Sequence, residues 1–417
     1  MTELSTACCI AGGGPAGMML GYLLARAGVD VFVLEKHDDF LRDFRGDTVH
    51  PSTLEVMREL GLLDEFLKRP HQEVRRLAAQ IGDETIHVAD FRRLRLAAPF
   101  IALMPQWDFL NFKSDKAKAF AGFHLMMEAE AVDLIRDGGR VTGLVAKTKD
   151  GELRIAAALI VGCDGRASTV RTLAGLKVED LGAPMDVLWL RLPRHESDDD
   201  ELPLGRAIAG GILVMIPRGD YFQCGFVVRK GGAEALRAKG LDAFKRQIET
   251  MAPVMRGRTD ALTSWDDVKL LSVSVDRLKT WCAPGVLCIG DAAHAMSPVG
   301  GVGINLAIQD AVATANLLYA PLRAGQVALD DLQAVQRRRE WPTKVTQGIQ
   351  VFIQKRAIAP MLAGAAPKAP WPAKLLNVFP PLRGLTARAV GMGARFEQVR
   401  SPAASEARRP PEDLATP

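Results

Sequence analysis

The N-terminal stretch of the chain alternates between apolar runs and one glycine-rich turn. Residues 7–11 are apolar, 12–17 read Gly-Gly-Gly-Pro-Ala-Gly, and 18–27 contain no proline and favour a helix. Residues 29–34 form a second, valine-rich run that ends at Glu35. A strand, a turn, a helix and a second strand in this order predict a βαβ unit with two parallel strands.

Elsewhere the apolar spacing switches between the period of a helix and that of a strand. Helices are predicted over 54–67, 105–120, 241–251, 304–318, 329–351 and 382–396. Strands are predicted over 74–81, 85–91, 94–104, 123–127, 131–136, 141–147, 153–157, 159–163, 187–192, 211–216, 221–228, 268–275 and 286–289. The strands within 74–104 and 181–280 have no glycine-rich phosphate turn, so they indicate a β-rich domain inserted into the first.

The turn at 12–17 has the spacing Gly-x-Gly-x-x-Gly of a dinucleotide-binding loop. Gly12 permits the tight turn, Gly14 lets the backbone approach a pyrophosphate, and Gly17 lets the helix pack closely on the strand. The N–H groups and the positive dipole end of the helix then face the phosphates. Glu35, 18 residues after Gly17, can accept hydrogen bonds from ribose hydroxyls, which favours FAD or NAD over NADP.

The bulk composition narrows the function classes. The chain has 417 residues, of which 48% are hydrophobic and 24% charged, as expected of a globular protein of two domains. The formal net charge of +4 is small, and no basic run is interleaved with aromatics, so no nucleic-acid partner is expected. The six cysteines are scattered without Cys-x-x-Cys, which indicates reduced residues of a cytoplasmic protein and no metal site. No stretch reaches the ~18 uninterrupted apolar residues of a membrane span.

Two further motifs follow predicted strands. Residues 163–171 contain Asp164-Gly165, either an ordinary strand–turn–helix with Ser168 as the cap or a carboxylate turn near a cofactor. Residues 290–294 contain Gly290-Asp291 and precede a glycine-rich loop at 298–303. An Asp at a strand end can accept from a ribitol or ribose hydroxyl, and the loop presents N–H groups to an electron-rich ring. For His294, a packed, hydrogen-bonded histidine is preferred over acid–base catalysis.

Together, the order and spacing of the three motifs resemble the class A flavoprotein aromatic hydroxylases, the family of para-hydroxybenzoate hydroxylase. The resemblance covers residues 7–320. It implies an FAD stretched across the first domain, with the carbonyl of Pro298 near substrate and flavin as the catalytic element. The cofactor contacts that it implies are Gly12, Gly14, Pro15, Ala16, Gly17, Glu35, Lys36, Arg45, Gln106, Val132, Asp164, Gly290, Asp291, Gly301, Gly303, Ile304 and Asn305.

The resemblance also implies the reaction. NADH or NADPH reduces the flavin, and O2 then gives a C4a-hydroperoxide that hydroxylates an aromatic, phenolic or polycyclic substrate. Two alternatives stay open: a flavin oxidoreductase of the same fold that reduces or epoxidises a polyprenyl or quinone-type lipid, and a non-catalytic FAD-binding protein. The single dinucleotide fingerprint and the lack of Cys-x-x-Cys argue against disulfide reductases of two dinucleotide domains.

The expected fold is α/β, with a Rossmann-like FAD-binding domain, an inserted β-sheet substrate domain and a C-terminal helical region. The FAD-binding domain is expected in three parts, the substrate domain in two, followed by helices and a disordered tail. The expected boundaries are, in chain order, 1–73 for FAD binding, 74–104 for substrate strands, 105–180 for FAD binding, 181–280 for the substrate sheet, 281–325 for FAD binding, 326–400 for C-terminal helices and 401–417 for the tail.

The substrate pocket and the surface contacts are the least specified features. Met215, Tyr221, Phe222 and Gln223, like Phe100 and Met104, are either pocket residues or ordinary sheet and core residues, with the second interpretation preferred. The segment 382–396 carries three arginines among apolar residues. It is either a core-packing helix, the preferred interpretation, or a weak membrane-surface contact. The assembly is expected to be a monomer or a homodimer.

Overall fold

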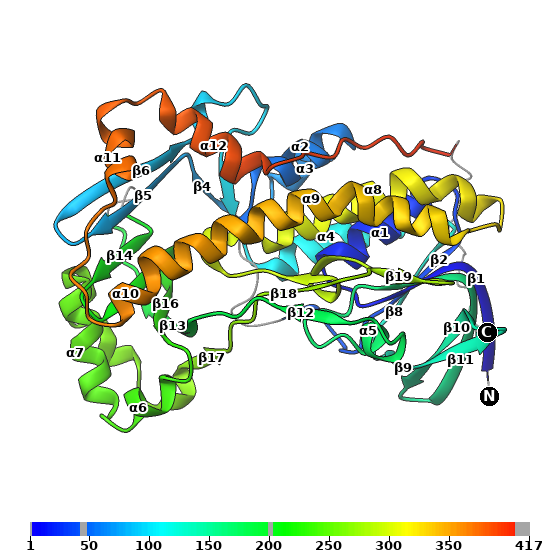
Figure 1. Ribbon diagram of the computed structural model, residues 1–417, viewed down its shortest axis with the longest axis horizontal. Helices are drawn as coiled ribbons and strands as arrows, with labels where there is room; N and C mark the ends of the chain where they lie inside the picture. The colour runs from blue at the N-terminus through cyan, green and yellow to red at the C-terminus, as the bar shows by residue number, and fades with distance from the viewer. Residues whose placement is uncertain (1, 42–47, 199–202, 405–417) are drawn as a thin grey trace, which may run out of the picture.

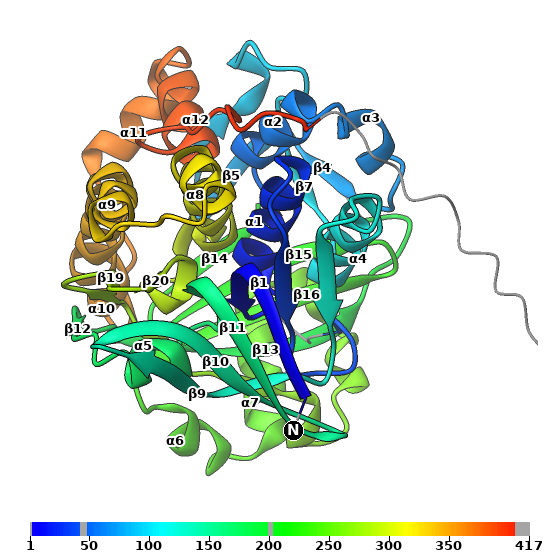
Figure 2. The ribbon, with the colours of Figure 1, turned by 90° about the vertical axis from the view of Figure 1, so that its right-hand side faces the viewer.

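Two large β-sheets organise the molecule (Figure 1, Figure 2). The computed structural model describes residues 2–41, 48–198 and 203–404. One sheet has eight strands in the order β19-β20-β11-β1-β2-β8, with β10 paired to β11 and β9 paired to β10, and the other has seven in the order β17-β13-β16-β15-β14-β5-β6. The expected mixed α/β fold is confirmed.

The eight-stranded sheet carries the glycine-rich turn at its centre. β1 (Thr2–Ala11) pairs in parallel with β2 (Val31–Leu34) on one side and with β11 (Gly151–Gly162) on the other. The other strands of this sheet are β8 (Phe123–Met126), β9 (Glu130–Asp137), β10 (Arg140–Thr148), β19 (Cys282–Ala283) and β20 (Val286–Cys288). Because β1, β11 and β20 run parallel, the loops that follow them meet at one edge of the sheet.

Helices cover this sheet and complete its core. α1 (Pro15–Arg26) is buried on nearly all sides, because it packs against the sheet, against α4 (Gln106–Ala117) and against α8 (Gly303–Arg323). α9 (Leu329–Ile353) lies along the outer side of α8 (Figure 1). The remaining helices are α2 (Pro51–Glu59), α3 (Leu63–Phe66), α5 (Thr169–Leu173), α6 (Ala233–Arg237), α7 (Leu241–Met251), α10 (Ala359–Leu362), α11 (Trp371–Val378) and α12 (Leu382–Met392).

The seven-stranded sheet joins two segments that are far apart in the sequence. Its strands are β5 (Arg76–Ile81), β6 (Glu84–Asp90), β13 (Met185–Pro193), β14 (Gly205–Ile208), β15 (Gly211–Arg218), β16 (Tyr221–Arg229) and β17 (Lys269–Leu271). The parallel pair β14–β5 connects the expected insertion at 74–104 to the strands within 181–280. One face of the sheet packs on α7, while Val299, from the glycine-rich loop, packs toward the other.

Several predicted strands are shorter than expected. The expected strand 94–104 is wrong over 94–100, where the chain turns, and only β7 (Ile101–Leu103) is extended. β7 pairs with β3 (Thr48–Val49) and β4 (Gln72–Val74) in a small sheet of its own. A second small sheet contains β12 (Val178–Asp180), β18 (Asp276–Leu278) and β21 (His294–Ala295).

The C-terminal part of the chain packs on the body of the molecule. α12 ends at Met392, earlier than predicted, because Gly393 leaves the helix with a φ of 75°. Its Ala387 is fully buried against β6 and its neighbours, so the core-packing interpretation of this segment is confirmed. Ser401 was expected to begin a disordered tail, but its carbonyl accepts from Arg26 Nη1 at 2.9 Å. That prediction is wrong over 401–404, and 405–417 lie outside the described residues.

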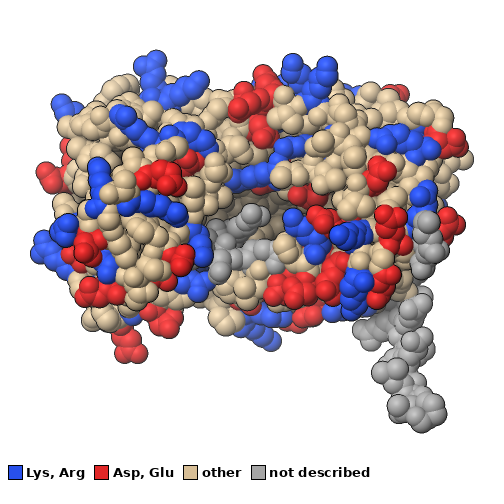
Figure 3. Space-filling view, turned by 90° about the horizontal axis from the view of Figure 1, so that it is seen from below, with Lys and Arg blue, Asp and Glu red and all other residues tan. Residues whose placement is uncertain are grey.

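The surface offers two further observations. Seen from below, the molecule is hollowed near its middle, with lysine and arginine side chains along part of the rim (Figure 3). Among the described helices, none is both long and apolar enough to cross a lipid bilayer.

Lys113 places a buried amine in the interface between α4 and α1. Its side chain is fully buried, its Nζ lies 3.3 Å from the centre of the Tyr22 ring, and Nζ has no hydrogen-bond partner among the described residues. Burial, with a smaller contribution from the like charge of Arg26, holds the pKa of the Lys113 amine well below its ordinary value. Protonation of the Lys113 amine is therefore less favourable in the folded state than in the unfolded chain.

Lys113→Met is expected to raise the free energy of unfolding at pH 7 by about 1–3 kcal/mol, because an apolar side chain of similar length needs no desolvation of charge. The folded pKa lies below the unfolded one, so the wild-type protein gains stability as pH rises toward about 10.5. Urea unfolding at pH 7 and pH 10 measures both effects. A variant that is less stable than wild type at pH 7 would contradict the assignment.

Candidate active site

Three motifs separated by more than a hundred residues meet at one edge of the eight-stranded sheet. A Cβ added to Gly12, after β1, would lie 2.4 Å from the carbonyl oxygen of Cys163, after β11. A Cβ added to Gly290, after β20, would lie 3.2 Å from the Cβ of Ala16 in α1. The second and third motifs are joined directly by the ion pair of Arg166 with Asp291.

The glycine-rich turn is built for close approach of a ligand. Gly12 has a φ of 105°, and a Cβ on Gly17 would lie 2.0 Å from the carbonyl oxygen of Gly12, so both positions require glycine for the fold itself. Gly14 differs, because a Cβ there would meet nothing within 4 Å. Pro15 and Ala16 begin α1, and no described side chain caps that helix. The open space therefore lies before an uncapped helix N-terminus, where backbone N–H groups favour an anion.

Glu35 lies beside this turn at the end of β2. Its Oε2 accepts from the N–H of Gly13 at 3.0 Å, and its Oε1 accepts from the N–H of His37 at 3.2 Å. These bonds fix the carboxylate next to the glycines, where the predicted contact with a ribose would need it. The exposed Lys36 follows it, whereas Arg45 lies outside the described residues.

Asp164 has a structural task at the end of β11. Its Oδ1 accepts from Ser168 Oγ at 2.5 Å and its Oδ2 accepts from the N–H of Val170 at 3.0 Å. Ser168 in turn caps α5 by accepting from the N–H of Arg171. The predicted cap is confirmed, and a cofactor contact by Asp164 stays a prediction.

Asp291 is half-buried in the short helical turn after β20. Its Oδ2 accepts from Arg166 Nε at 3.1 Å, and the two side chains are each 33% exposed. Gly290 has a φ of 59° and fits tightly between α1 and α8, because a Cβ there would lie 3.1 Å from Ala307. The carboxylate is thus held close to α1 and accessible to a ligand.

The loop 298–303 connects this turn to the N-terminus of α8. Pro298 is half-buried, Gly301 has a φ of 62°, and a Cβ on Gly301 would lie 2.5 Å from Thr48 Oγ1. No described side chain caps α8, so the amides from Gly303 and Ile304 lie at the positive end of a 21-residue helix. These features suit an electron-rich ring that gains negative charge.

Asn305 joins the N-termini of α8 and α2. Its Oδ1 accepts from the N–H of His50 at 2.8 Å and from Thr53 Oγ1 at 2.7 Å. Its Nδ2 donates to the carbonyls of Thr48 and Gly301 at 3.2 and 3.3 Å. The side chain is therefore committed to the protein, which leaves only the backbone of Asn305 for the predicted cofactor contact.

Two other predicted cofactor residues lie near the same edge. Gln106 is half-buried and begins α4, which packs beside α1. Val132 is 37% exposed on β9, and the segment just before this strand is tied to Glu35, whose carbonyl accepts from the N–H of Ala129 at 2.9 Å. Their contacts with a cofactor stay predictions.

A buried charge network beneath Gly290 was missed from the sequence. Asp310 of α8 is fully buried; its Oδ2 lies 2.6 Å from His294 Nε2 and accepts from the N–H of Gly290 at 3.1 Å. Its Oδ1 accepts from Arg339 Nε at 2.8 Å, and Arg339 Nη1 reaches Glu397 at 3.3 Å. A lone aspartate in the apolar run 304–318 was the available signal. The predicted packed, hydrogen-bonded role of His294 is confirmed.

This network keeps Asp310 ionised. Burial raises the pKa of the Asp310 carboxyl, but His294 and Arg339 outweigh it, so the pKa lies below its ordinary value. The carboxylate thereby links the Gly290–Asp291 turn to α9 and to the C-terminal segment around Glu397.

The alternation of side chains along the seven-stranded sheet corrects part of the predicted pocket. Met215 pairs with Cys224, and both lie with Phe222 in the core under α7. Met215 and Phe222 therefore face away from the glycine-rich loop, and their assignment to the pocket is wrong. Gln223, predicted as a pocket residue, pairs with Ile216 and belongs to the opposite face.

That opposite face is apolar with a few polar groups. Trp189 pairs with Gly225, whose added Cβ would lie 3.1 Å from the Trp189 ring, and Arg191 pairs with Gln223. The indole Nε1 of Trp189 is buried with no hydrogen-bond partner among the described residues. Val299 packs against the same group of residues as Trp189. This face thus lies toward the loop where the flavin ring is predicted.

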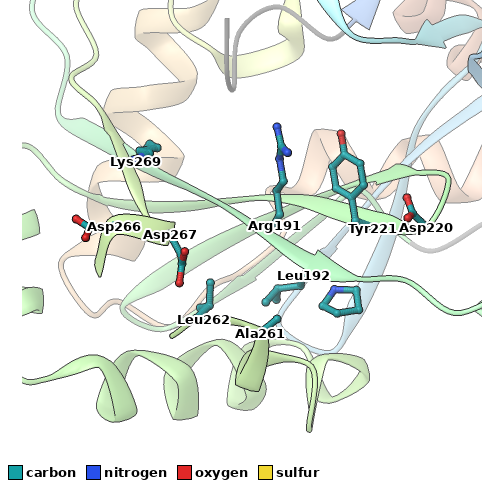
Figure 4. Close-up of a pocket in the computed structure, with 10 residues that line it drawn as sticks. Arg191, Leu192, Asp220, Tyr221, Ala261, Leu262, Asp266, Asp267 and Lys269 are labelled. Carbon is teal, nitrogen blue, oxygen red and sulfur yellow. The ribbon is translucent and has the colours of Figure 1, made fainter. Parts of the chain in front are cut away.

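Tyr221 marks the outer end of this face. In Figure 4 the side chains of Arg191 and Tyr221 rise from the same side of the sheet, whereas Leu192 and Leu262 lie on the other. The Arg191 guanidinium is 5.3 Å from the Tyr221 ring centre. Both line an open pocket of about 570 Å³ that Asp266, Asp267 and Lys269 also line. No residue of the three motifs lines it, so this pocket is separate from the cofactor edge.

Phe100 and Met104 belong to the hydrophobic core, as the preferred interpretation held. Both are almost fully buried in the cluster under the first sheet. Phe100 stacks on His71 at 6.1 Å, and Arg75 lies 5.1 Å from its ring centre.

His50 provides a pH-dependent test of the contact between α2 and α8. It is fully buried, and burial lowers the pKa of its imidazole to about 4, with the Val390 carbonyl acting weakly in the other direction. The folded pKa is below the ordinary value near 6.5, so stability is expected to fall by about 3 kcal/mol as pH drops from 6.5 to 4. His50→Gln should remove this part of the pH dependence in urea unfolding. An unchanged pH profile would contradict it.

Taken together, the edge of the sheet fits an FAD. It offers open space at Gly14 before an uncapped helix, a fixed carboxylate at Glu35, an accessible carboxylate at Asp291 and a second helix N-terminus at Gly303. These features are, in order, what a pyrophosphate, a ribose, a ribitol and a flavin ring need.

Comparison with known proteins agrees with this fit. The family model described as FAD binding domain matches residues 5–348. A 6-methylpretetramide 4-monooxygenase of Streptomyces rimosus is 31% identical over 94% of this chain and 94% of its own length. A rifampicin monooxygenase of Streptomyces venezuelae is 30% identical over 72% of this chain, and the chain spans only 61% of that protein.

The fold is also that of a solved structure. PqsL of P. aeruginosa, in complex with 2-aminobenzoylacetate, superposes with a TM-score of 0.73 over 86% of this chain and 99% of that chain, at 24% identity. The family match and the relatives confirm the predicted cofactor and enzyme class. The chain belongs to this FAD-binding family and is an FAD-dependent monooxygenase.

Proposed function

We propose that the enzyme hydroxylates a phenolic or polycyclic aromatic small molecule with O2, using NADH or NADPH as the reductant. The observation that carries the proposal is the sheet face around Trp189, which lies toward the glycine-rich loop at Val299. A flat, mainly apolar face with few polar groups suits a planar aromatic ring. The relatives named for 6-methylpretetramide and rifampicin support a substrate of this class.

The protein groups divide the work around the cofactor. Bound FAD would supply electron transfer from NAD(P)H and activation of O2. The positive end of α8 at Gly303 would stabilise negative charge on the flavin ring. The Trp189 ring would close the far side of the pocket against water, and the Gln223 amide would orient a phenolic oxygen. We further propose the carbonyl of Pro298 as the contact between loop and substrate.

Gln223→Leu tests the orienting role. Loss of one hydrogen bond to a substrate oxygen is expected to lower kcat/KM for the best phenol about tenfold. Met215→Leu is the matched control, because Met215 lies on the opposite face of the same sheet. If Met215→Leu lowers kcat/KM while Gln223→Leu does not, the assignment of the two faces is wrong.

The reaction class is tested by NAD(P)H consumption. The purified flavoprotein should oxidise NADH or NADPH faster when a suitable phenol is added from a panel, and a hydroxylated product should form in proportion. Consumption that depends on a polyprenyl or quinone lipid and proceeds without O2 would favour the reductase alternative. No consumption with any substrate would favour a non-catalytic FAD-binding protein.

We also propose a cytoplasmic enzyme that is a monomer or a homodimer. All six cysteines are free, and four of them, Cys8, Cys9, Cys224 and Cys288, are fully buried. Reduced, buried thiols suit a reducing compartment. Light scattering after size-exclusion chromatography distinguishes the two assemblies.

A further inference from the structure

The C-terminal part of the chain has an unusual charge. Residues 341–396 contain no Asp or Glu, while the whole chain has a net charge of +4. The basic residues of this segment are Lys344, Lys355, Arg356, Lys368, Lys374, Arg383, Arg388 and Arg395. The segment therefore carries +8 and the rest of the chain carries −4. Positive charge is concentrated in one stretch of an otherwise acidic molecule.

The part of α9 that lies in this stretch has its polar side inward. Gln347 and Gln350 are buried, and their amides donate to the carbonyls of Ala295 and Val299, among others. On the outer side, Ile349 is 54% exposed and Phe352 is 64% exposed. A surface helix normally buries its apolar side, so the reversed arrangement leaves an apolar stripe without a partner among the described residues.

α11 repeats this arrangement. Its polar Asn377 is used inward, since it donates to the Thr85 carbonyl at 2.7 Å and accepts from the N–H of His87 at 3.0 Å. Trp371 is 74% exposed and Val378 is 79% exposed. Nine of the fourteen exposed large hydrophobic residues in the described part of the chain lie within 341–396.

A groove beside α12 combines the two properties. It has a volume of about 440 Å³, an apolar lining that includes Leu94 and Leu385, and three arginines, Arg93, Arg95 and Arg388. No acidic residue lines it. Of the basic groups on these helices, Lys374 pairs with Glu84 at 2.6 Å and Lys344 pairs with Glu340 at 2.9 Å.

These helices lie on one side of the molecule. Figure 1 and Figure 2 place α9, α11 and α12 on the same side, with α11 and α12 above the end of α9. We define the C-terminal face by its exposed apolar residues Ile349, Phe352, Trp371, Leu375, Val378, Phe379 and Leu385. We propose that the C-terminal face binds the surface of an anionic lipid bilayer.

Charge and chemistry favour an anionic bilayer over two other partners, a second copy of the chain and an acidic protein. A second copy of the chain would bring the same face against itself in a symmetric dimer, so the net positive charge of one copy's segment 341–396 would oppose that of the other. A bilayer surface accepts exposed tryptophan, phenylalanine and leucine side chains at the depth of the head groups, while anionic head groups attract the surrounding Lys and Arg. An acidic protein would satisfy the charges, but it would not specifically require so many exposed apolar groups.

Co-sedimentation of the holoenzyme with vesicles tests the proposal. Wild type should bind vesicles of phosphatidylcholine with phosphatidylserine and bind pure phosphatidylcholine at least tenfold more weakly. Phe352→Ser with Trp371→Ser should weaken binding to the anionic vesicles at least tenfold. Leu317→Ser with Val178→Ser is the matched control, because these residues are 39% and 41% exposed outside the C-terminal face.

The charge contribution has its own variant pair. Lys355→Glu with Arg356→Glu should weaken vesicle binding, whereas Lys147→Glu with Lys239→Glu, exposed elsewhere, should change it little. FAD absorbance and thermal unfolding check that every variant is folded.

Four results would overturn the proposal. One is wild type that binds neither kind of vesicle, and another is binding that the Phe352→Ser, Trp371→Ser variant retains. The third is a wild-type protein that dimerises in sedimentation velocity while the Phe352→Ser, Trp371→Ser variant stays monomeric. That result would assign the face to a second copy of the chain. Binding to polyglutamate but not to vesicles would assign it to an acidic protein and would equally contradict a bilayer.

Discussion

Gly14→Val is expected to abolish FAD retention while the protein stays folded. Gly14 has a φ of −72° and extended backbone, which valine adopts readily, and its added Cβ meets no protein atom within 4 Å. A branched side chain would fill only the open space before α1, where the pyrophosphate must approach. The affinity for FAD should fall at least a hundredfold, as measured by titration of the apoprotein with FAD.

Gly205→Val is the matched control for this variant. Gly205 also has open space around its added Cβ, but it lies on β14 of the other sheet. FAD affinity should be unchanged in the control, and both variants should unfold at the wild-type temperature. Flavin absorbance that survives desalting of the Gly14→Val protein would remove the pyrophosphate site from this turn.

Asp310→Asn is expected to lower the free energy of unfolding by about 3–5 kcal/mol, because it removes the carboxylate that accepts from Arg339 Nε in the core and leaves Glu397 as the acidic partner of the buried Arg339. The folded pKa of Asp310 is lowered, so its stabilisation is complete above about pH 4 and is lost only below that. The variant should also retain FAD less tightly, since the N–H of Gly290 loses a charged acceptor. Urea unfolding and FAD titration at pH 7 measure the two effects.

The surface pair of Glu340 with Lys344 provides the comparison. It is exposed and spans one helical turn, so Glu340→Gln should cost less than about 1 kcal/mol. An Asp310→Asn protein as stable as Glu340→Gln would contradict the role of the buried network.

The cofactor edge was predictable because its signals are local. Gly12, Gly17 and Glu35 sit at fixed spacing in one βαβ unit, and their tasks follow from backbone geometry. The convergence of Asp164 and Asp291 on this turn followed from the resemblance, and the parallel order of β20, β11 and β1 explains it. Ser168 as a cap was also readable from a short stretch.

The rest depends on contacts that no local pattern contains. Whether Met215 or Gln223 faces the pocket depends on which side of the sheet each alternate residue of β15 and β16 occupies. This is fixed only when α7 covers one face of the sheet. The partners of Asp310, on α9 and near Glu397, are far along the chain. The polar inner side of α9 was hidden because Gln347 and Gln350 look like surface residues until their carbonyl partners are known.

The most direct test of the monooxygenase account follows the oxygen atom itself. The purified holoenzyme is supplied with NADH or NADPH, with the phenol that most stimulates oxidation of that nucleotide, and with isotopically labelled O2. The mass of the product is then measured by mass spectrometry. The account predicts a hydroxylated product that carries one labelled oxygen atom from O2. A product whose added oxygen comes from water, or turnover that leaves the substrate without a new oxygen atom, would contradict it.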